Sequence, residues 1–107
     1  MTSPTATQSI ADGVAIHRRA RVEKGAVVKG PAIIGDGANI EAGAVIANHR
    51  NEQTDKRIRI RAGAEIIDTG VDKFGTLVGD GARIGANAVI APGAVVPRLA
   101  LVDQGAD

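Results

Sequence analysis

The chain contains no cysteine, no tryptophan and no tyrosine, and only one phenylalanine. The absence of cysteine excludes a disulfide scaffold and a thiolate metal site, and it fits a reducing compartment. The scarcity of aromatic residues is unusual, because globular cores normally obtain much of their buried area from them. The 107 residues instead include 14 glycines and many alanines, valines and isoleucines. This composition favours thin, repetitive layers packed with small branched side chains.

The chain also lacks an excess of charge of either sign. Thirteen Lys and Arg against twelve Asp and Glu leave a net charge of +1, so no bulk attraction to nucleic acid or an anionic membrane is expected. The N-terminal stretch MTSPTATQSIADG has no basic segment followed by an apolar one, and no apolar run approaches the length of a membrane span. We therefore expect a cytoplasmic protein with neither a nucleic-acid nor a membrane partner.

A six-residue repeat dominates what is present. Aliphatic residues recur at every sixth position in two blocks: Ile10, Ile16, Val22, Val28, Ile34, Ile40 and Ile46, then Val78, Ile84, Ile90, Val96 and Val102. Two positions before them stand small residues: Ala20, Ala26, Ala32, Ala38, Ala44, Thr76, Ala82, Ala88, Ala94 and Ala100. Three positions before many of them stand residues that tolerate a left-handed turn: Gly13, Gly25, Gly37, Gly43, Gly81, Asn87 and Gly93.

A period of six fits neither an α-helix nor an alternating strand. It fits a chain that runs straight, turns through about a third of a circle, and repeats, so that three hexads make one triangular coil. Successive coils would then stack at the ~4.8 Å spacing of β-strands, with the aliphatic residue pointing inward and alanine at the inner corner. A series of antiparallel hairpins would need spacings of roughly eight to twelve residues, and so does not explain the register.

Segments such as IIGDGANIEAGAVIAN and VGDGARIGANAVIAPGAVV resemble the hexapeptide-repeat transferase family. The resemblance implies a left-handed parallel β-helix and a homotrimer. Twelve hexads make four coils, and Ile60 and Ile66 also fall on the later count, which adds part of a fifth. We thus predict an all-β, single-domain, trimeric left-handed parallel β-helix of about four to five coils. Its first hexad block spans 8–47, an ejected loop and return segment spans 48–77, and the second block spans 78–102.

The interruption of the repeat is the first candidate for function, because long connections within a compact scaffold are often functional. It consists of a polar excursion at 48–56, the run RIRIR at 57–61 and a turn-bearing return at 62–77. The alternating run predicts a strand with one buried and one cationic face. Such a cationic face suits an anion such as phosphate. The alternative is a solvated outer strand whose arginines discourage edge pairing.

A narrower resemblance lies in this segment. Ala47-Asn48-His49-Arg50, Ile58-Arg59-Ile60, Asp68-Thr69-Gly70, Lys73-Phe74-Gly75, Gly79-Asp80 and Pro92-Gly93 are the matching pieces. Their order resembles the C-terminal acetyltransferase domain of bifunctional sugar-1-phosphate nucleotidylyltransferase/amino-sugar acetyltransferases. The resemblance implies transfer of an acetyl group from acetyl-CoA to an amine on a sugar phosphate, at a cleft between subunits. Its implied substrate-binding residues are Asn48, Lys56, Arg59 and Lys73.

The chain departs from that subgroup in two ways. No nucleotidylyltransferase domain is expected within the 107 residues, and a separate chain is a possible source of that activity. The subgroup's histidine and tyrosine are replaced by Gly25 and Val28, so the expected general base is missing. Of the two histidines present, His49 beside Asn48 is the candidate catalytic base, with a surface loop residue as the alternative. His17 is interpreted as an exposed turn residue.

Other polar residues have simpler interpretations. Asp36, Asp68 and Asp80 occur in turn sequences and are expected to serve as turn and corner residues. No spacing of His, Asp and Glu predicts a metal site.

Three functions remain open at this level. The first is a small acyltransferase. The second is a non-catalytic trimeric module that binds a sugar phosphate or another anion. The third is a structural unit whose open coil ends stack head to tail.

Overall fold

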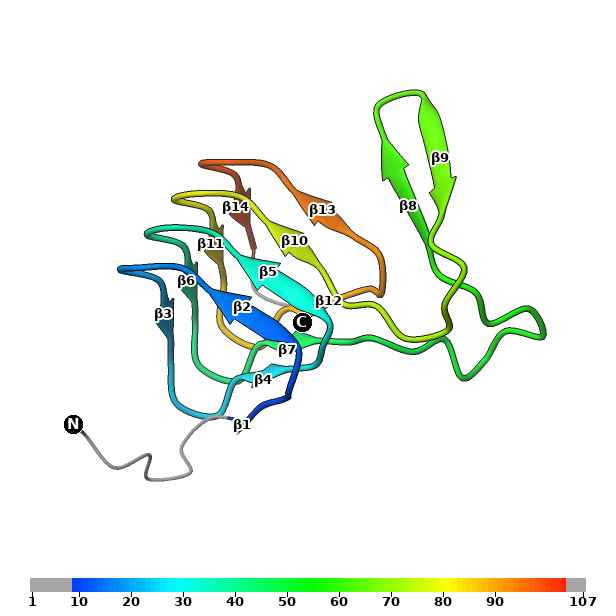
Figure 1. Ribbon diagram of the computed structural model, residues 1–107. Helices are drawn as coiled ribbons and strands as arrows, with labels where there is room; N and C mark the ends of the chain where they lie inside the picture. Colours follow the sequence, from blue (N-terminus) through cyan, green and yellow to red (C-terminus); the bar gives the residue numbers. More distant parts are fainter. Residues whose placement is uncertain (1–8, 104–107) are drawn as a thin grey trace.

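The computed structural model describes residues 9–103, which form 14 strands and no helix. Twelve strands build a prism of four stacked coils, and the other two form a hairpin outside it (Figure 1). The first coil comprises β1 (Ser9–Ile10), β2 (Val14–Ile16) and β3 (Arg21–Val22). The second comprises β4 (Val27–Val28), β5 (Ala32–Ile34) and β6 (Asn39–Ile40). The third comprises β7 (Val45–Ile46), β10 (Leu77–Val78) and β11 (Arg83–Ile84), and the fourth β12 (Val89–Ile90), β13 (Val95–Val96) and β14 (Leu101–Val102).

Each side of the prism is a four-stranded parallel sheet. Sheet A has the order β1-β4-β7-β12, sheet B the order β13-β10-β5-β2, and sheet C the order β14-β11-β6-β3. In sheet A, Ile10 pairs with Val28 and Val28 pairs with Ile46, a step of three hexads. The structure thus confirms the predicted parallel β-helix and its three hexads per coil.

The core is a column of the hexad aliphatic residues and the corner alanines. Ile34, Ile40, Ile46 and Ile84 are completely buried, and burying an isoleucine side chain contributes about 1.5–3 kcal/mol. The remaining buried members of the column are Ala26, Val28, Ala32, Ala38, Ala44, Val78, Ala82, Ala88, Ile90 and Val96. Packing weakens toward the first coil, where Ile10 and Ile16 are 39% and 40% exposed.

The corners use the left-handed backbone conformation at the predicted position. All of the expected glycines and Asn87 have positive φ angles. Arg19 (φ 66°) and Leu99 (φ 63°) occupy the same position and were not foreseen. A left-handed conformation costs a non-glycine residue about 1–2 kcal/mol, so the coil geometry imposes it on these two side chains.

The interruption leaves the third coil after β7 and returns to it at β10. It contains β8 (Arg59–Ala62) and β9 (Glu65–Asp68), an antiparallel hairpin that projects away from the prism (Figure 1). The expected partial fifth coil is therefore wrong. Ile60 and Ile66 lie in the hairpin, where they pair with Ile67 and Arg61, so the six-residue count that they share with the second block is coincidental.

The predicted alternation of the RIRIR run is confirmed. Ile58 is fully buried and Ile60 is 9% exposed, whereas Arg57, Arg59 and Arg61 are exposed. The strand itself begins at Arg59. The cationic side chains therefore lie outside, and the isoleucines pack the base of the hairpin against the rest of the protein.

No helix in the described part of the chain has the length and hydrophobicity needed to cross a membrane.

Candidate functional site

The candidate site forms at the corners between sheet A and sheet B, where the loop leaves the prism. Asn48 Nδ2 donates to Gly30 O (2.7 Å), which belongs to the second coil. Gly75 N donates to Pro31 O and Gly93 N donates to Gly75 O, both at 2.7 Å. These bonds join the corners of three successive coils. The two ends of the ejected loop are consequently held at fixed positions on a rigid scaffold.

His49 is half-buried at the start of the loop, and its Nδ1 lies 2.9 Å from Asp72 O. A carbonyl oxygen can only accept a hydrogen bond, so the neutral imidazole that makes this contact carries its proton on Nδ1. Its Nε2 then bears a lone pair. In this tautomer Nε2, and not Nδ1, is the ring nitrogen that can accept a hydrogen bond.

Two of the predicted substrate-binding residues lie beside His49. Phe74 N donates to Asn48 O (2.9 Å), which brings the return segment alongside the departing one. Lys73, between Asp72 and Phe74, is exposed at this contact. Asn48, His49 and Lys73 therefore come together at one corner although 23 residues separate His49 from Asp72.

The other two predicted residues, Lys56 and Arg59, make separate local contacts. The Lys56 ammonium donates to the backbone carbonyls of Asn51 (3.0 Å) and Gln53, which closes the polar excursion on itself. Arg59 Nη2 lies 2.9 Å from Asp55 Oδ2. Within residues 9–103, no hydrogen bond or ion pair joins either side chain to Asn48, His49 or Lys73.

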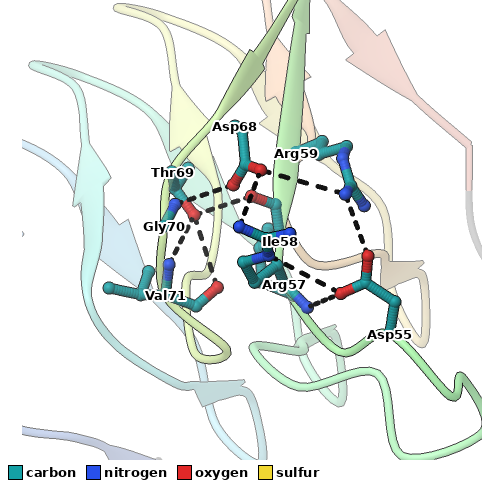
Figure 2. Close-up of polar contacts among 8 residues, drawn as sticks. All are labelled: Asp55, Arg57, Ile58, Arg59, Asp68, Thr69, Gly70 and Val71. Atoms are coloured by element: carbon teal, nitrogen blue, oxygen red, sulfur yellow. Dashed lines mark hydrogen bonds and ion pairs between the residues drawn. The ribbon is translucent and has the colours of Figure 1, made fainter.

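Two aspartates clamp the base of the hairpin (Figure 2). Asp55 bridges Arg59 and Arg57, and it accepts a hydrogen bond from Arg57 N (3.1 Å). Asp68 Oδ2 lies 3.5 Å from Arg57 Nη1 and 3.8 Å from Arg59 Nη2. The hydrogen bonds donated by the Arg59 side chain and then by Arg57 N hold the pKa of the Asp55 carboxyl below its ordinary value. The clamp commits Arg57 and Arg59 to internal partners.

A cleft of about 380 Å³ lies between the hairpin and the corner that joins β12 to β13. Its lining residues are Arg50, Arg59, Arg61, Ile66, Ala91, Pro92, Gly93 and Ala94. Arg50 Nη2 donates to Pro92 O (3.1 Å), which fixes its guanidinium at the cleft. Arg50 stands in the Ala-Asn-His-Arg motif, yet the alternating run that drew attention to the arginines does not include it. The structure identifies Arg50 as a candidate binding residue because its side chain lines the cleft.

The positions matched to the missing histidine and tyrosine lie elsewhere. Gly25 precedes β4, at the exposed corner where sheet C joins the N-terminal ends of the sheet A strands. His49 follows β7, at the C-terminal ends of those strands. Val28 is 1% exposed and points into the core. His49 in the same chain therefore does not occupy the corner at which Gly25 stands.

Of the three aspartates expected at turns, Asp36 and Asp80 lie in turns, whereas Asp68 is the last residue of β9 and its side chain caps the turn that follows. Asp80 Oδ1 accepts from Asp36 N (2.9 Å), and Asp68 Oδ1 accepts from Gly70 N (2.8 Å). Asp36 also binds Arg19, whose hydrogen bond lowers the pKa of this carboxyl. His17 is exposed, as expected. Across the described ranges, His, Asp and Glu side chains form no group of three or more that could hold a metal ion.

Residues 10–48 match the family model described as bacterial transferase hexapeptide (six repeats). The match covers the first two coils and β7, and it ends at Asn48 where the loop begins. It supports a relation to the hexapeptide-repeat transferases over this part of the chain. No curated protein matches the chain significantly.

Proposed function

We propose that the protein is an acyltransferase that moves an acetyl or related acyl group from acyl-CoA to an amino-sugar or sugar-phosphate acceptor. The observation that carries this proposal is the contact between His49 Nδ1 and Asp72 O, which leaves Nε2 free to accept a proton. The family match supports the reaction class. A cytoplasmic location, where acyl-CoA is available, is part of the proposal.

The chemistry requires one base. An acceptor amine attacks the thioester carbonyl carbon of acyl-CoA and forms the new C–N bond, while His49 Nε2 takes the proton that the amine loses. The tetrahedral intermediate then collapses, the C–S bond breaks, and the CoA thiolate leaves and recovers that proton from the imidazolium. A positioned general base of this kind contributes about 10²–10⁴-fold to the rate.

The neighbouring side chains would bind the acceptor. Asn48 and Lys73 lie on the same corner as His49, a suitable arrangement for a sugar hydroxyl and a phosphate. Lys56 and Arg59 would contribute positive charge from the loop side, although both already have internal partners. A separate nucleotidylyltransferase chain would act on the product if the resemblance to the bifunctional proteins extends to the pathway.

The outer face of sheet B supports a homotrimer with the cleft at the subunit boundary. Ala15, Ile33, Leu77 and Val95 form an apolar ladder along this face, in the register of the strand pairing. Ile33 and Val95 are 45% and 43% exposed, and the groove around them encloses about 280 Å³. The outer face of sheet C instead carries Arg21, Asn39 and Arg83, and its ladder has an apolar residue, Leu101, only in the last coil. Association through sheet B would remove its apolar surface from water.

The test is a thiol-release assay with acetyl-CoA and a panel of amino sugars and their phosphates. We expect acceptor-dependent release of CoA, and His49→Gln should lower kcat by at least about 10²-fold. His17→Gln is the matched control, because the other histidine is exposed and distant in sequence from the loop, and it should retain full activity. Equal activity of His49→Gln and the unaltered protein would exclude His49 as the base.

A second function is favoured by the residues at Gly25 and Val28, which cannot supply a base. In this case the protein binds a sugar phosphate or another anion without reacting. The same panel then gives no CoA release with any acceptor, while calorimetry shows saturable binding of a sugar phosphate that is equal in His49→Gln and in the unaltered protein.

A further inference from the structure

Two arginines that line the hairpin cleft, Arg50 and Arg61, contrast with the neighbouring Arg57 and Arg59, which have acidic partners. Arg57 and Arg59 share Asp55 and Asp68. Among residues 9–103, neither Arg50 nor Arg61 has a carboxylate within ion-pair distance. Both line the same cleft of about 380 Å³. Their charges therefore remain available to a ligand there.

The two arginines reach the cleft from different parts of the fold. Arg50 comes from the start of the loop and is fixed by its hydrogen bond to Pro92 O, which uses one of its five N–H donors. Arg61 comes from β8 and shares one face of the hairpin with Ile66, its partner in the strand pairing. The two guanidinium groups thus approach one space from separate elements of the fold.

Apart from Arg59, which is paired with Asp55, the remaining wall is apolar. Ile66, Pro92 and Ala94 line it, and Ile66 is 57% exposed in the described chain. A volume of about 380 Å³ lies in the range of small-molecule sites. Guanidinium groups bind phosphate oxygens in a bidentate manner, and the apolar wall suits a flat or hydrophobic group attached to the phosphate.

We propose that Arg50 and Arg61 form a binding site for the phosphate ester of a small molecule, with its organic portion on Ile66 and Pro92. This proposal rests on the proposed acyltransferase function and deepens it, because it assigns phosphate binding to residues other than Lys56, Arg59 and Lys73. The ester could belong to the nucleotide end of an acyl donor or to a phosphorylated acceptor. The chemistry of recognition is the same in both cases.

The experiment is calorimetric titration of the whole protein with three probes: adenosine 3′,5′-bisphosphate, glucosamine phosphate, and neutral adenosine. We expect saturable binding of at least one phosphate ester and none of adenosine at matched concentrations. Which ester binds identifies its source. Arg50→Gln and Arg61→Gln should each weaken binding by roughly tenfold or more, as expected for the loss of a charge-assisted hydrogen bond.

Arg83→Gln is the matched control, because Arg83 is an exposed arginine on the outer face of sheet C, and it should bind as the unaltered protein does. Circular dichroism of each variant checks that the prism is intact, and Arg61→Lys should recover part of the affinity. Binding of neither ester would overturn the proposal. So would affinities in Arg50→Gln and Arg61→Gln equal to that of Arg83→Gln, or binding of adenosine as tight as that of the bisphosphate.

Discussion

At the scale of single residues, Asp55 controls the base of the hairpin. Its two oxygens contact Arg59 and Arg57, which flank the buried Ile58 (Figure 2). Ile58 N in turn donates to Val71 O (2.8 Å), so the clamp and the entry to β8 reinforce each other. The exposure of the ion pairs means that solvent screens them, and the local geometry of the hairpin depends on them more than overall stability does.

We predict that acid loosens this clamp. The hydrogen bond from Arg59 lowers the pKa of Asp55 in the folded protein, so its contribution is present above the ordinary aspartate value of 3.8 and is lost as the pH falls through the lower, folded value. The protection factor of the Ile58 amide, which corrects the exchange rate for its intrinsic pH dependence, should fall as the pH drops through that interval. Asp55→Asn should exchange faster at neutral pH and lose the acid dependence.

Asp12→Asn serves as the control, because Asp12 is exposed and has no ion pair within residues 9–103. It should leave exchange at Ile58 unchanged. Identical exchange profiles for Asp55→Asn and the unaltered protein would show that Asp55 does not hold the hairpin.

At the scale of structural elements, the hairpin depends on one close approach to the prism. A Cβ added at Gly93 would lie 2.6 Å from Arg59 O and 2.7 Å from Ile58 Cγ2, both nearer than van der Waals contact allows. Gly93 also has a φ of 81°, which disfavours any other residue. The base of the hairpin can therefore pack against the backbone of the fourth coil only because Gly93 has no side chain.

We predict that Gly93→Ala displaces the hairpin while the coils persist. Gly37→Ala isolates the backbone effect, because Gly37 has a φ of 71° and a Cβ there would meet nothing within 4 Å. Both variants should lose about 1 kcal/mol from the left-handed conformation. Only Gly93→Ala should accelerate limited proteolysis in residues 48–57 and weaken phosphate-ester binding. Equal proteolysis of the two variants would contradict the close approach.

At the scale of the whole molecule, four coils leave much apolar surface in contact with water. The ladder on sheet B is one such surface, and the hairpin adds Ile66 and Ile67, which are 57% and 49% exposed. A homotrimer would bury part of this area through one repeated interface.

We predict a particle of three times the 10.9 kDa chain mass by sedimentation equilibrium. Val95→Lys, on the outer face of sheet B, should shift the protein toward monomer because it places a charge in the interface. Arg83→Lys, on sheet C, should remain trimeric. A monomer at all concentrations would remove the proposed intersubunit cleft, and a mass that keeps rising with concentration would indicate stacking of coil ends.

Much of the prism could be predicted because its rule is local. A residue such as Ile40 points inward since it stands at a fixed place in a hexad, and that place also sets its pairing with Val22 and Ile84. The rule failed at Ile60, which follows the count but lies in the hairpin. Six-residue spacing alone does not distinguish a coil from a strand whose alternation has period two, because six is a multiple of two.

The candidate site was predictable only in part. The loop motif pointed to Asn48, His49 and Lys73, and the fold brings all three to one corner. Neither the tautomer of His49 nor the role of Arg50 could be foreseen. The first depends on Asp72 O and the second on Pro92 O, and both partners are remote in sequence.

The sequence by itself determined the four-coil prism, its inward residues and the point at which the loop leaves, because a repeat places every hexad in the same environment. Only the tertiary structure decided which arginines form ion pairs within the chain and which do not. Arg57, Arg59 and Arg61 follow one alternating pattern, yet within residues 9–103 the first two form ion pairs with Asp55 and Asp68 and the third forms none. The physical reason is that an ion pair depends on distance in space, and the irregular loop and hairpin set that distance without any repeat.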